Sequence, residues 1–292
     1  MSMLQEISFG PHYFKMALLF RDSILISSML GSSEVLYGLT KSHIEKLEQV
    51  DRIFFRRLFQ VPNCTTIEAF YLETSAVPIR FLLTGRRLLY LWDILQKNES
   101  ELVRKVYNSQ KLFTAKNDWI LQVKSDLDEC GIFLTDNEIA MMKRISFKKL
   151  VKDKINLLSA QYLCSLKERH SKSSNLQYSK EMEPYLRNEL LSIESKKLMF
   201  RIKNRLIDVK TNFKGKYKNN LKCCLCENPE ESQPHLVECS EIVSNEEIKK
   251  ALEDFSYNDI FSTNLQVQTY LVNTWKLIMK IRNIKLKQLS CK

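Results

Sequence analysis

The chain of 292 residues has little glycine and proline, with six residues of each. Parallel nucleotide-binding folds and β-sandwiches use both residues in their many turns, so their scarcity favours helices. We find no alternating run of apolar and polar residues that predicts a strand, and no internal repeat. Hydrophobic residues make up 44% and charged residues 27%, a globular composition. The sequence therefore predicts a mostly α fold.

Long apolar runs are also missing. A membrane-spanning helix needs about 18 to 20 apolar residues, and the best candidate, 81–95, is interrupted by Arg86, Arg87 and Asp93. No basic segment followed by an apolar stretch marks a signal peptide. We therefore expect no membrane partner, and a nuclear or cytoplasmic protein that is not secreted. In such a reducing compartment the eight cysteines would stay free of disulfides.

Helical periodicity runs through most of the chain. Pro78 is expected to open one strong helix, with Arg86 and Arg87 on its solvated face, and Gly131 is expected to end another. The spacing of Thr135 and Glu138 is typical of a helix start. We predict helices over 44–58, 79–95, 117–129 and 146–169, from 183 onward, and twice within 246–289. The polar stretch 170–181 predicts a linker, so the chain divides into an N-terminal helical region (1–130), a connector with linker (131–182) and a C-terminal region (183–292).

Positive charge is concentrated in short segments. The net charge is +11, but residues 196–222 alone carry ten Lys or Arg against the single acid Asp208. Residues 143–154 carry a net charge of +5 and residues 276–292 a net charge of +6. The rest of the chain is slightly acidic. Clustering of this kind is typical of proteins that bind nucleic acid.

A cysteine and histidine cluster provides the strongest local chemistry. Cys223, Cys226, His235 and Cys239 lie within 17 residues and offer three thiolates and one imidazole. Zinc prefers such a closed tetrahedral set, which leaves no open position for a reacting water and is therefore structural. Cys224 is a spare thiol that could compete with Cys223, although only Cys223 gives the two-residue spacing to Cys226. The alternative is a group of unrelated thiols and a surface histidine.

The basic segment leads directly into this cluster. On a continuous helix, Lys197, Arg201 and Arg205 would lie in one row. The following stretch alternates cations with aromatic residues that could stack on bases. The alternative is a solvated helix face and a loop whose aromatic residues pack on the metal unit. The candidate nucleic-acid-binding residues are Lys197, Arg201, Lys203, Arg205, Lys210, Phe213, Lys214, Lys216, Tyr217 and Lys218.

The runs 199–203, 208–214 and 223–239 resemble the C-terminal segment of LINE-type (non-LTR) retrotransposon reverse transcriptases, where a basic stretch precedes a Cys-Cys-His-Cys (CCHC) knuckle. The runs 20–25, 47–51, 56–62 and 73–80 are similar to the thumb and post-thumb helices of that family. The resemblance covers roughly 14–130 and 196–240. The gap of three residues between His235 and Cys239 differs from the gap of four that is also common in the family.

The resemblance implies a thumb-like domain over 1–130 and a zinc knuckle in a segment that binds RNA or an RNA–DNA duplex. In an intact relative this segment would support target-primed reverse transcription. Polymerase chemistry needs paired aspartates for two metal ions, and the sequence contains no Asp-Asp dipeptide. We therefore expect a fragment that is not an enzyme, unless a longer copy supplies the polymerase palm. The alternative is a zinc-stabilised helical module that contacts proteins and not nucleic acid.

Overall fold

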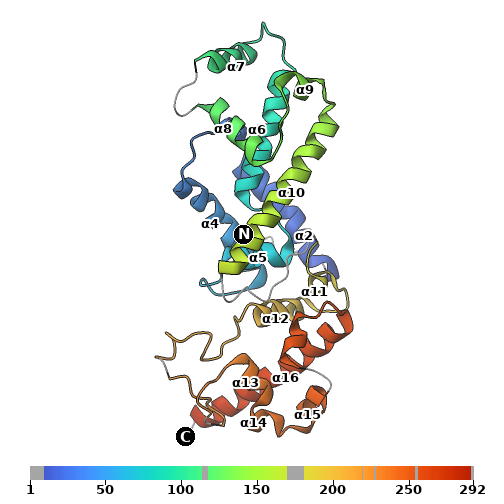
Figure 1. Cartoon of the computed structure of the whole chain (residues 1–292). Coiled ribbons are helices and arrows are strands. Elements are labelled where there is room, and N and C mark those ends of the chain that lie inside the picture. The colour runs from blue at the N-terminus through green and yellow to red at the C-terminus, as the bar shows by residue number, and fades with distance from the viewer. Residues whose placement is uncertain are drawn as a thin grey trace. The chain divides into compact units, whose positions relative to one another are not determined.

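The computed structural model describes residues 10–113, 118–169, 181–218, 220–226, 228–253 and 256–290. It is mostly α-helical, as the sequence predicts, and these ranges contain no strand (Figure 1). Apart from residue 181, the predicted linker 170–181 lies outside the described residues. Among the helices of the described ranges, none is long and apolar enough to cross a membrane.

The chain divides into two compact units, each assembled from distant segments. Unit 1 consists of Met1–Ala17, Arg56–Ser75 and Lys167–Lys292. Unit 2 consists of Leu18–Phe55 and Ala76–Leu166. The predicted ranges 1–130, 131–182 and 183–292 follow the chain continuously, whereas these units do not.

Unit 2 is built around the helix α6 (Ile79–Leu95), which contacts η3, α7, α8 and α9. Apolar residues on α6, α8 and α10 form much of its main buried core. The other elements of this unit, some of which extend past its limits, are α2 (Tyr13–Phe20), the π-helix η2 (Arg21–Ile26), α3 (Ser27–Met29), η3 (Ser33–Val35), α4 (Lys41–Phe59), α7 (Leu102–Leu112), α8 (Trp119–Glu129), α9 (Asp136–Met141) and α10 (Arg144–Arg169).

Local sequence signals set several helix ends in unit 2. Pro78 directly precedes α6, as predicted, and Gly131 follows α8 with a left-handed φ of +58°. At the start of α9 the Thr135 hydroxyl accepts a hydrogen bond from the Glu138 N–H, and the Glu138 carboxylate accepts one from the Thr135 N–H. This reciprocal pair is the capping box that the spacing predicts.

The prediction that Arg86 and Arg87 lie on a solvated face of α6 is wrong. Arg87 is buried and donates to both carboxylate oxygens of Asp126 on α8, at 2.6 and 3.0 Å. Arg86 is half-buried and donates to the carbonyl oxygen of Leu30 at 2.7 Å. A second buried pair joins Arg21 and Asp51 through two hydrogen bonds of 2.7 and 2.6 Å. Arginine therefore links the helices of unit 2 through its interior.

Unit 1 has an aromatic core. The rings of Phe59 and Phe200 stack with centroids 4.0 Å apart, and Phe14 and Phe70 complete the cluster. All four are fully buried, so Phe200 in the basic segment belongs to the core. The elements lying wholly in this unit are η1 (Gly10–His12), α5 (Ile67–Thr74), α11 (Pro184–Arg187), α12 (Ile193–Lys203), α13 (Gln233–Glu238), α14 (Ser240–Val243), α15 (Glu246–Glu253), η4 (Tyr257–Phe261) and α16 (Leu265–Ser290).

Candidate metal centre and nucleic-acid interface

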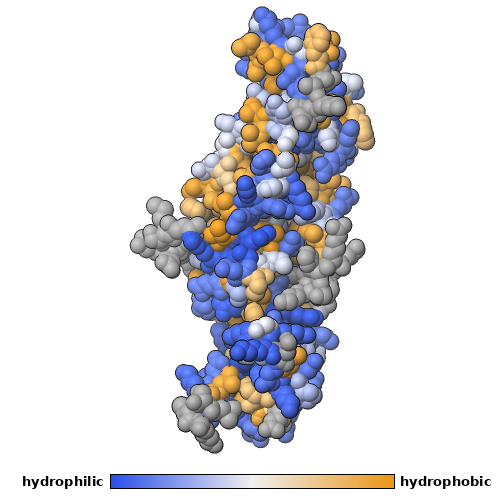
Figure 2. All heavy atoms as spheres, turned by 90° about the vertical axis from the view of Figure 1, so that its left-hand side faces the viewer, coloured by the Kyte–Doolittle hydropathy of each residue, from blue (hydrophilic) through white to orange (hydrophobic). Residues whose placement is uncertain are grey.

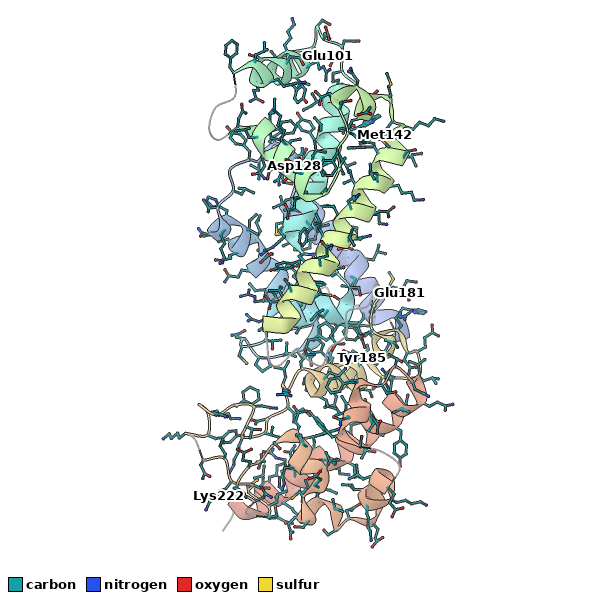
Figure 3. The ribbon with its side chains drawn as sticks, in the orientation of Figure 1. Glu101, Asp128, Met142, Glu181, Tyr185 and Lys222 are labelled. Atoms are coloured by element: carbon teal, nitrogen blue, oxygen red, sulfur yellow. The ribbon has the colours of Figure 1, made fainter. Side chains whose placement is uncertain are left out.

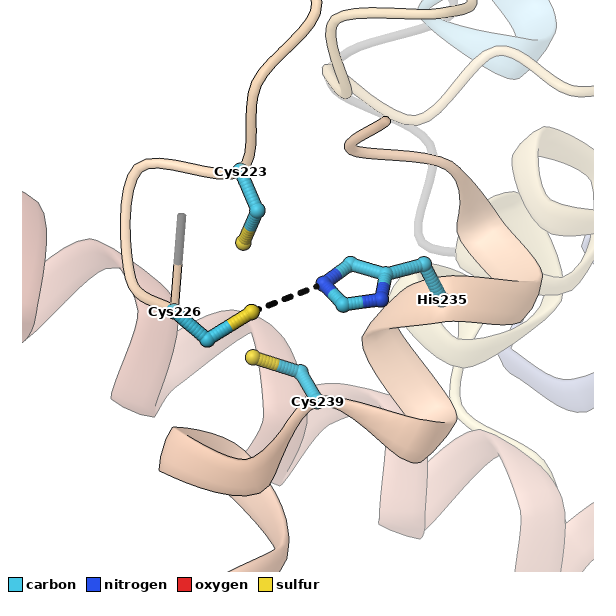
Figure 4. Close-up of side chains that lie close together, drawn as sticks. All are labelled: Cys223, Cys226, His235 and Cys239. Carbon is cyan, nitrogen blue, oxygen red and sulfur yellow. Dashed lines mark hydrogen bonds between the residues drawn. The ribbon is translucent and has the colours of Figure 1, made fainter. Parts of the chain in front are cut away.

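The four predicted ligands come together in unit 1. One ligand atom from each of Cys223, Cys226, His235 and Cys239 lies within 4.8 Å of all the others (Figure 4). The Cys226 Sγ and the His235 Nε2 are 3.2 Å apart. Cys223 and Cys239 are buried, whereas Cys226 and His235 are half-buried. The side chains converge on one point, as a four-coordinate ion requires.

A turn and a short helix orient the four side chains of the group. A turn over 224–226 brings Cys226 beside Cys223, whose N–H donates to the carbonyl oxygen of Asn228 at 2.7 Å. His235 lies in the first turn of α13, which begins after Ser232, and the Ser232 hydroxyl accepts from the His235 N–H. Cys239 lies at the junction of α13 and α14. Backbone geometry thus positions all four ligands.

Cys224 is separate from the ligand group. Its Sγ donates to the Glu231 Oε2 at 3.0 Å, on the carboxylate of a fully buried residue. Burial, this hydrogen bond and the charge of Glu231 raise the pKa of the Cys224 thiol to about 12. Of the two adjacent cysteines, the structure therefore groups Cys223 with the other ligands.

The donor set can hold a metal ion. Burial, a hydrogen bond with Cys226 and the charge of Cys223 raise the pKa of the Cys239 thiol to about 12. The Cys239 thiol therefore needs a nearby cation in order to ionise at neutral pH, and a bound divalent ion supplies that charge while replacing the thiol proton. The group fits a closed metal site with sulfur and nitrogen ligands.

Glu231 links the segment with the candidate metal ligands to the C-terminal helix. Arg282 on α16 is buried and donates to the Glu231 Oε1 at 2.5 Å. Burial opposes ionisation of Glu231, but hydrogen bonds from Cys224 and Arg282 keep its pKa below the ordinary value. The basic segment 276–292 thus contributes a structural cation. Cys291 and Lys292 lie outside the described residues.

The prediction that Lys197, Arg201 and Arg205 lie in one row on a single helix is wrong for Arg205. Helix α12 stops at Lys203, and Arg205 follows it in the left-handed region with φ of +54°. The backbone thus turns away before Arg205 can join Lys197 and Arg201. Arg201 and Arg205 are both half-buried.

Two other predicted phosphate ligands face the interior of unit 1. Lys203 is buried, with its Nζ 2.6 Å from the Glu183 Oε2 and 3.5 Å from the Glu73 Oε2. Its ammonium also lies 5.2 Å from the ring centre of Tyr185, which is labelled in Figure 3. Lys197 is buried as well and pairs with Glu194 at 3.0 Å. Neither ammonium is presented to a ligand.

The remaining candidates lie in a loop beside the metal centre, residues 210–222, which we call the basic loop. Its ends are held by Glu231, whose carbonyl oxygen accepts from the Thr211 N–H at 3.1 Å and whose N–H donates to the carbonyl oxygen of Leu221 at 2.7 Å. The Lys210 Nζ closes the loop by donating to the carbonyl oxygen of Lys222 at 2.6 Å. The side chains of Lys210, Phe213 and Tyr217 are half-buried, and those of Lys214, Lys216, Lys218 and Lys222 are exposed. Lys222, at the end of the loop, is labelled in Figure 3.

One acid lies against the basic loop. Asp208 accepts from the Lys216 ammonium at 2.7 Å and from the Tyr217 hydroxyl at 2.8 Å. Burial alone would raise the pKa of Asp208, but these two partners lower it. Asp208 thereby fixes the Tyr217 ring, over which Lys216 lies at 5.1 Å.

Sequence reasoning did not single out Glu73, Glu183, Glu231 or Arg282 as partners of the site. Each is an ordinary charged residue in the sequence, and its ion-pair partner lies between 20 and 130 residues away. No local spacing signals such a contact. The exception is Glu231, whose place between two ligand pairs makes contact with the knuckle a reasonable expectation.

No family model matches the chain, and neither a curated protein nor a solved structure matches it. The sequence resemblance and the geometry of the site therefore supply the basis for a functional proposal.

Proposed function

We propose that this chain is a nucleic-acid-binding, C-terminal segment of a LINE-type (non-LTR) reverse transcriptase. Its ligand is RNA or an RNA–DNA duplex, which the basic loop binds through its exposed lysines. A zinc ion in the Cys3His group holds the loop in place. In an intact element this segment would bind the template or target during target-primed reverse transcription. A separate polymerase palm would catalyse DNA synthesis.

The donor set supports zinc as the metal. Three cysteine sulfurs and one histidine nitrogen within a 4.8 Å group match the ligand types and number of structural zinc sites. Harder ions such as Mg²⁺ and Ca²⁺ prefer oxygen ligands, and the group has none. Because all four positions are filled by protein, the ion would act on folding and not on a substrate.

The observation that carries the proposal is the exposure of the basic loop directly beside this centre. Five lysines and no acid occur in 210–222, and four of these lysines are exposed. The ammonium groups of Lys214, Lys218 and Lys222 make no ion pair within the described ranges of the chain. Lysines held on a fixed loop can displace counterions from a phosphate backbone without first breaking contacts in the protein. Phe213 and Tyr217, between these lysines, provide ring faces on which bases can stack.

Charge reversal in the basic loop tests the proposal. We expect K214E/K218E/K222E to weaken binding of a single-stranded RNA about tenfold or more in fluorescence anisotropy, because three phosphate contacts are lost. The matched control is K124E/K249E/K250E, which makes the same change in net charge at three exposed lysines outside the basic segments. Equal affinities of the two variants would contradict the proposal, provided that both keep the wild-type helix content.

A protein-contacting role is the second candidate, and one surface of unit 2 favours it. Figure 2 shows hydrophobic side chains at the end of unit 2 that carries α7. Leu102, Leu112 and Phe113 are each more than three-quarters exposed there. A hollow of about 200 Å³ opens beside them, lined by Val35, Tyr37, Tyr90, Ile94, Val103, Val106, Tyr107, Gln110 and Trp119. If the chain only contacts proteins, RNA affinity will be absent and partner binding will depend on this surface.

A further inference from the structure

The basic segment 143–154 is not used by the proposed function. It covers the start of α10 in unit 2, whereas the basic loop belongs to unit 1. Two of its cations are tied into the fold. The Lys154 ammonium donates to the carbonyl oxygen of Gly131 at 3.2 Å, and Arg144 pairs with Asp93 at 3.4 Å. The other four, Lys143, Lys148, Lys149 and Lys152, are exposed.

Helix α10 has two different faces in this region. Phe147, Val151 and Ile155 recur every four residues and are buried against the core of unit 2. With 3.6 residues per turn, Lys148, Lys149 and Lys152 fall within about 100° of one another on the outer side. Lys148 and Lys152 are one turn apart, which is about 6 Å along the helix axis. Within the described residues their ammonium groups have no hydrogen bond or ion pair.

We propose that Lys148, Lys149 and Lys152 on α10 form a second nucleic-acid-binding surface, which contacts backbone phosphates independently of the basic loop. The inference rests on the proposed function for the identity of the polyanion, but it uses residues of the other unit. The helix fixes the backbone positions of the three lysines, so binding a phosphate backbone orders their side chains but not the main chain. The surface would thus add affinity without sequence specificity.

The arrangement favours nucleic acid over a membrane. A helix that lies on a membrane inserts an apolar face among the lipids and keeps its cations on the opposite face. The apolar face of α10 is already occupied, since Phe147, Val151 and Ile155 pack inside the protein. Between residues 143 and 153 the exposed side chains are mainly cationic, with Ile145 and Asp153 also exposed. Contact with a phosphate backbone needs exposed cations and does not need a free apolar face.

The test is charge reversal on α10 in the full chain. We expect K148E/K149E/K152E to weaken binding of a single-stranded RNA of about 30 nucleotides about tenfold. The slope of log affinity against log salt should become shallower by about 2, since each phosphate contact on a single strand contributes about 0.7. The control K124E/K249E/K250E should stay within about twofold of the wild type. Circular dichroism checks that both variants fold.

The other outcomes separate the two proposals. If the basic-loop variant loses binding while the α10 variant binds like the control, the second surface is refuted and the proposed function stands. If the wild-type chain does not bind RNA at low salt, both fail. Vesicles of phosphatidylcholine with about one third phosphatidylserine provide the remaining arm. Vesicle binding that K148E/K149E/K152E abolishes, with RNA affinity unchanged, would assign the surface to a membrane and overturn the inference.

Discussion

C226S should remove the metal from the protein and unfold the segment around residues 221–243, while unit 2 keeps its helices. Three ligands cannot complete the tetrahedral set, and structural zinc in small fingers contributes about 10 to 16 kcal/mol of folding free energy. Such a short segment has too little core of its own to fold without this contribution. Elemental analysis of the purified wild type should find about one zinc per chain, and C226S should contain almost none.

The adjacent cysteines provide a matched control. C224S should keep full metal content, because a serine hydroxyl can donate to Glu231 as the Cys224 thiol does. Loss of zinc from C224S together with its retention in C226S would reverse the assignment of ligands. A wild-type chain that is folded and free of metal would refute the metal site altogether.

K203M should be the most destabilising single change in the interior of unit 1. Glu183 lies 2.6 Å from the buried Lys203 ammonium, and removing the ammonium leaves this buried carboxylate beside Glu73 without its ion-pair partner. Breaking a buried ion pair at one partner costs about 3 to 5 kcal/mol, because the remaining charge stays buried without compensation. Urea denaturation of the full chain followed by circular dichroism measures the loss. A change below about 1 kcal/mol would show that the cluster is not ionised.

E73Q provides the comparison, and it should lower the free energy of unfolding far less than K203M does. Burial, the largest effect on this group, raises the pKa of Glu73 to about 7, so its neutral form is already favoured in the folded chain. Because this pKa is above the ordinary value of 4.5, the folded state binds the proton more tightly than the unfolded state does. The contribution of the Glu73 carboxyl to the free energy of unfolding is therefore at its maximum below pH 4.5, and it is lost as the pH rises through about 7. Relative to E73Q, the wild type should become less stable between these two values.

The grouping of the candidate metal ligands could be predicted because its signal is local. Cys223, Cys226, His235 and Cys239 are close in sequence, and a turn and one short helix are enough to bring them together. The helices could be predicted for a similar reason, since Pro78, Gly131 and the pair Thr135 and Glu138 mark helix ends within a few residues.

The roles of individual cations could not be predicted in this way. Nothing in the neighbouring sequence distinguishes Lys203 from the exposed lysines that follow it in the basic loop. Nothing there distinguishes Arg87 from a cation on a solvated helix face either. Their burial depends on Glu183 and Asp126, which are 20 and 39 residues away and meet them only in the folded chain. The helix end before Arg205 was also missed, because neither glycine nor proline marks it. A count of positive charge thus overstates the number of lysines available to a ligand.

The salt dependence of RNA affinity tests the central claim most directly. Four exposed lysines of the basic loop, each contacting one phosphate, predict that log affinity falls with log salt with a slope of about −3 on single-stranded RNA. The measurement uses the zinc-loaded wild-type chain over a range of sodium chloride concentrations. A slope at least this steep, made shallower by about 2 in K214E/K218E/K222E, is the result that the account predicts. RNA affinity that does not change with salt, or no binding at low salt, would contradict it.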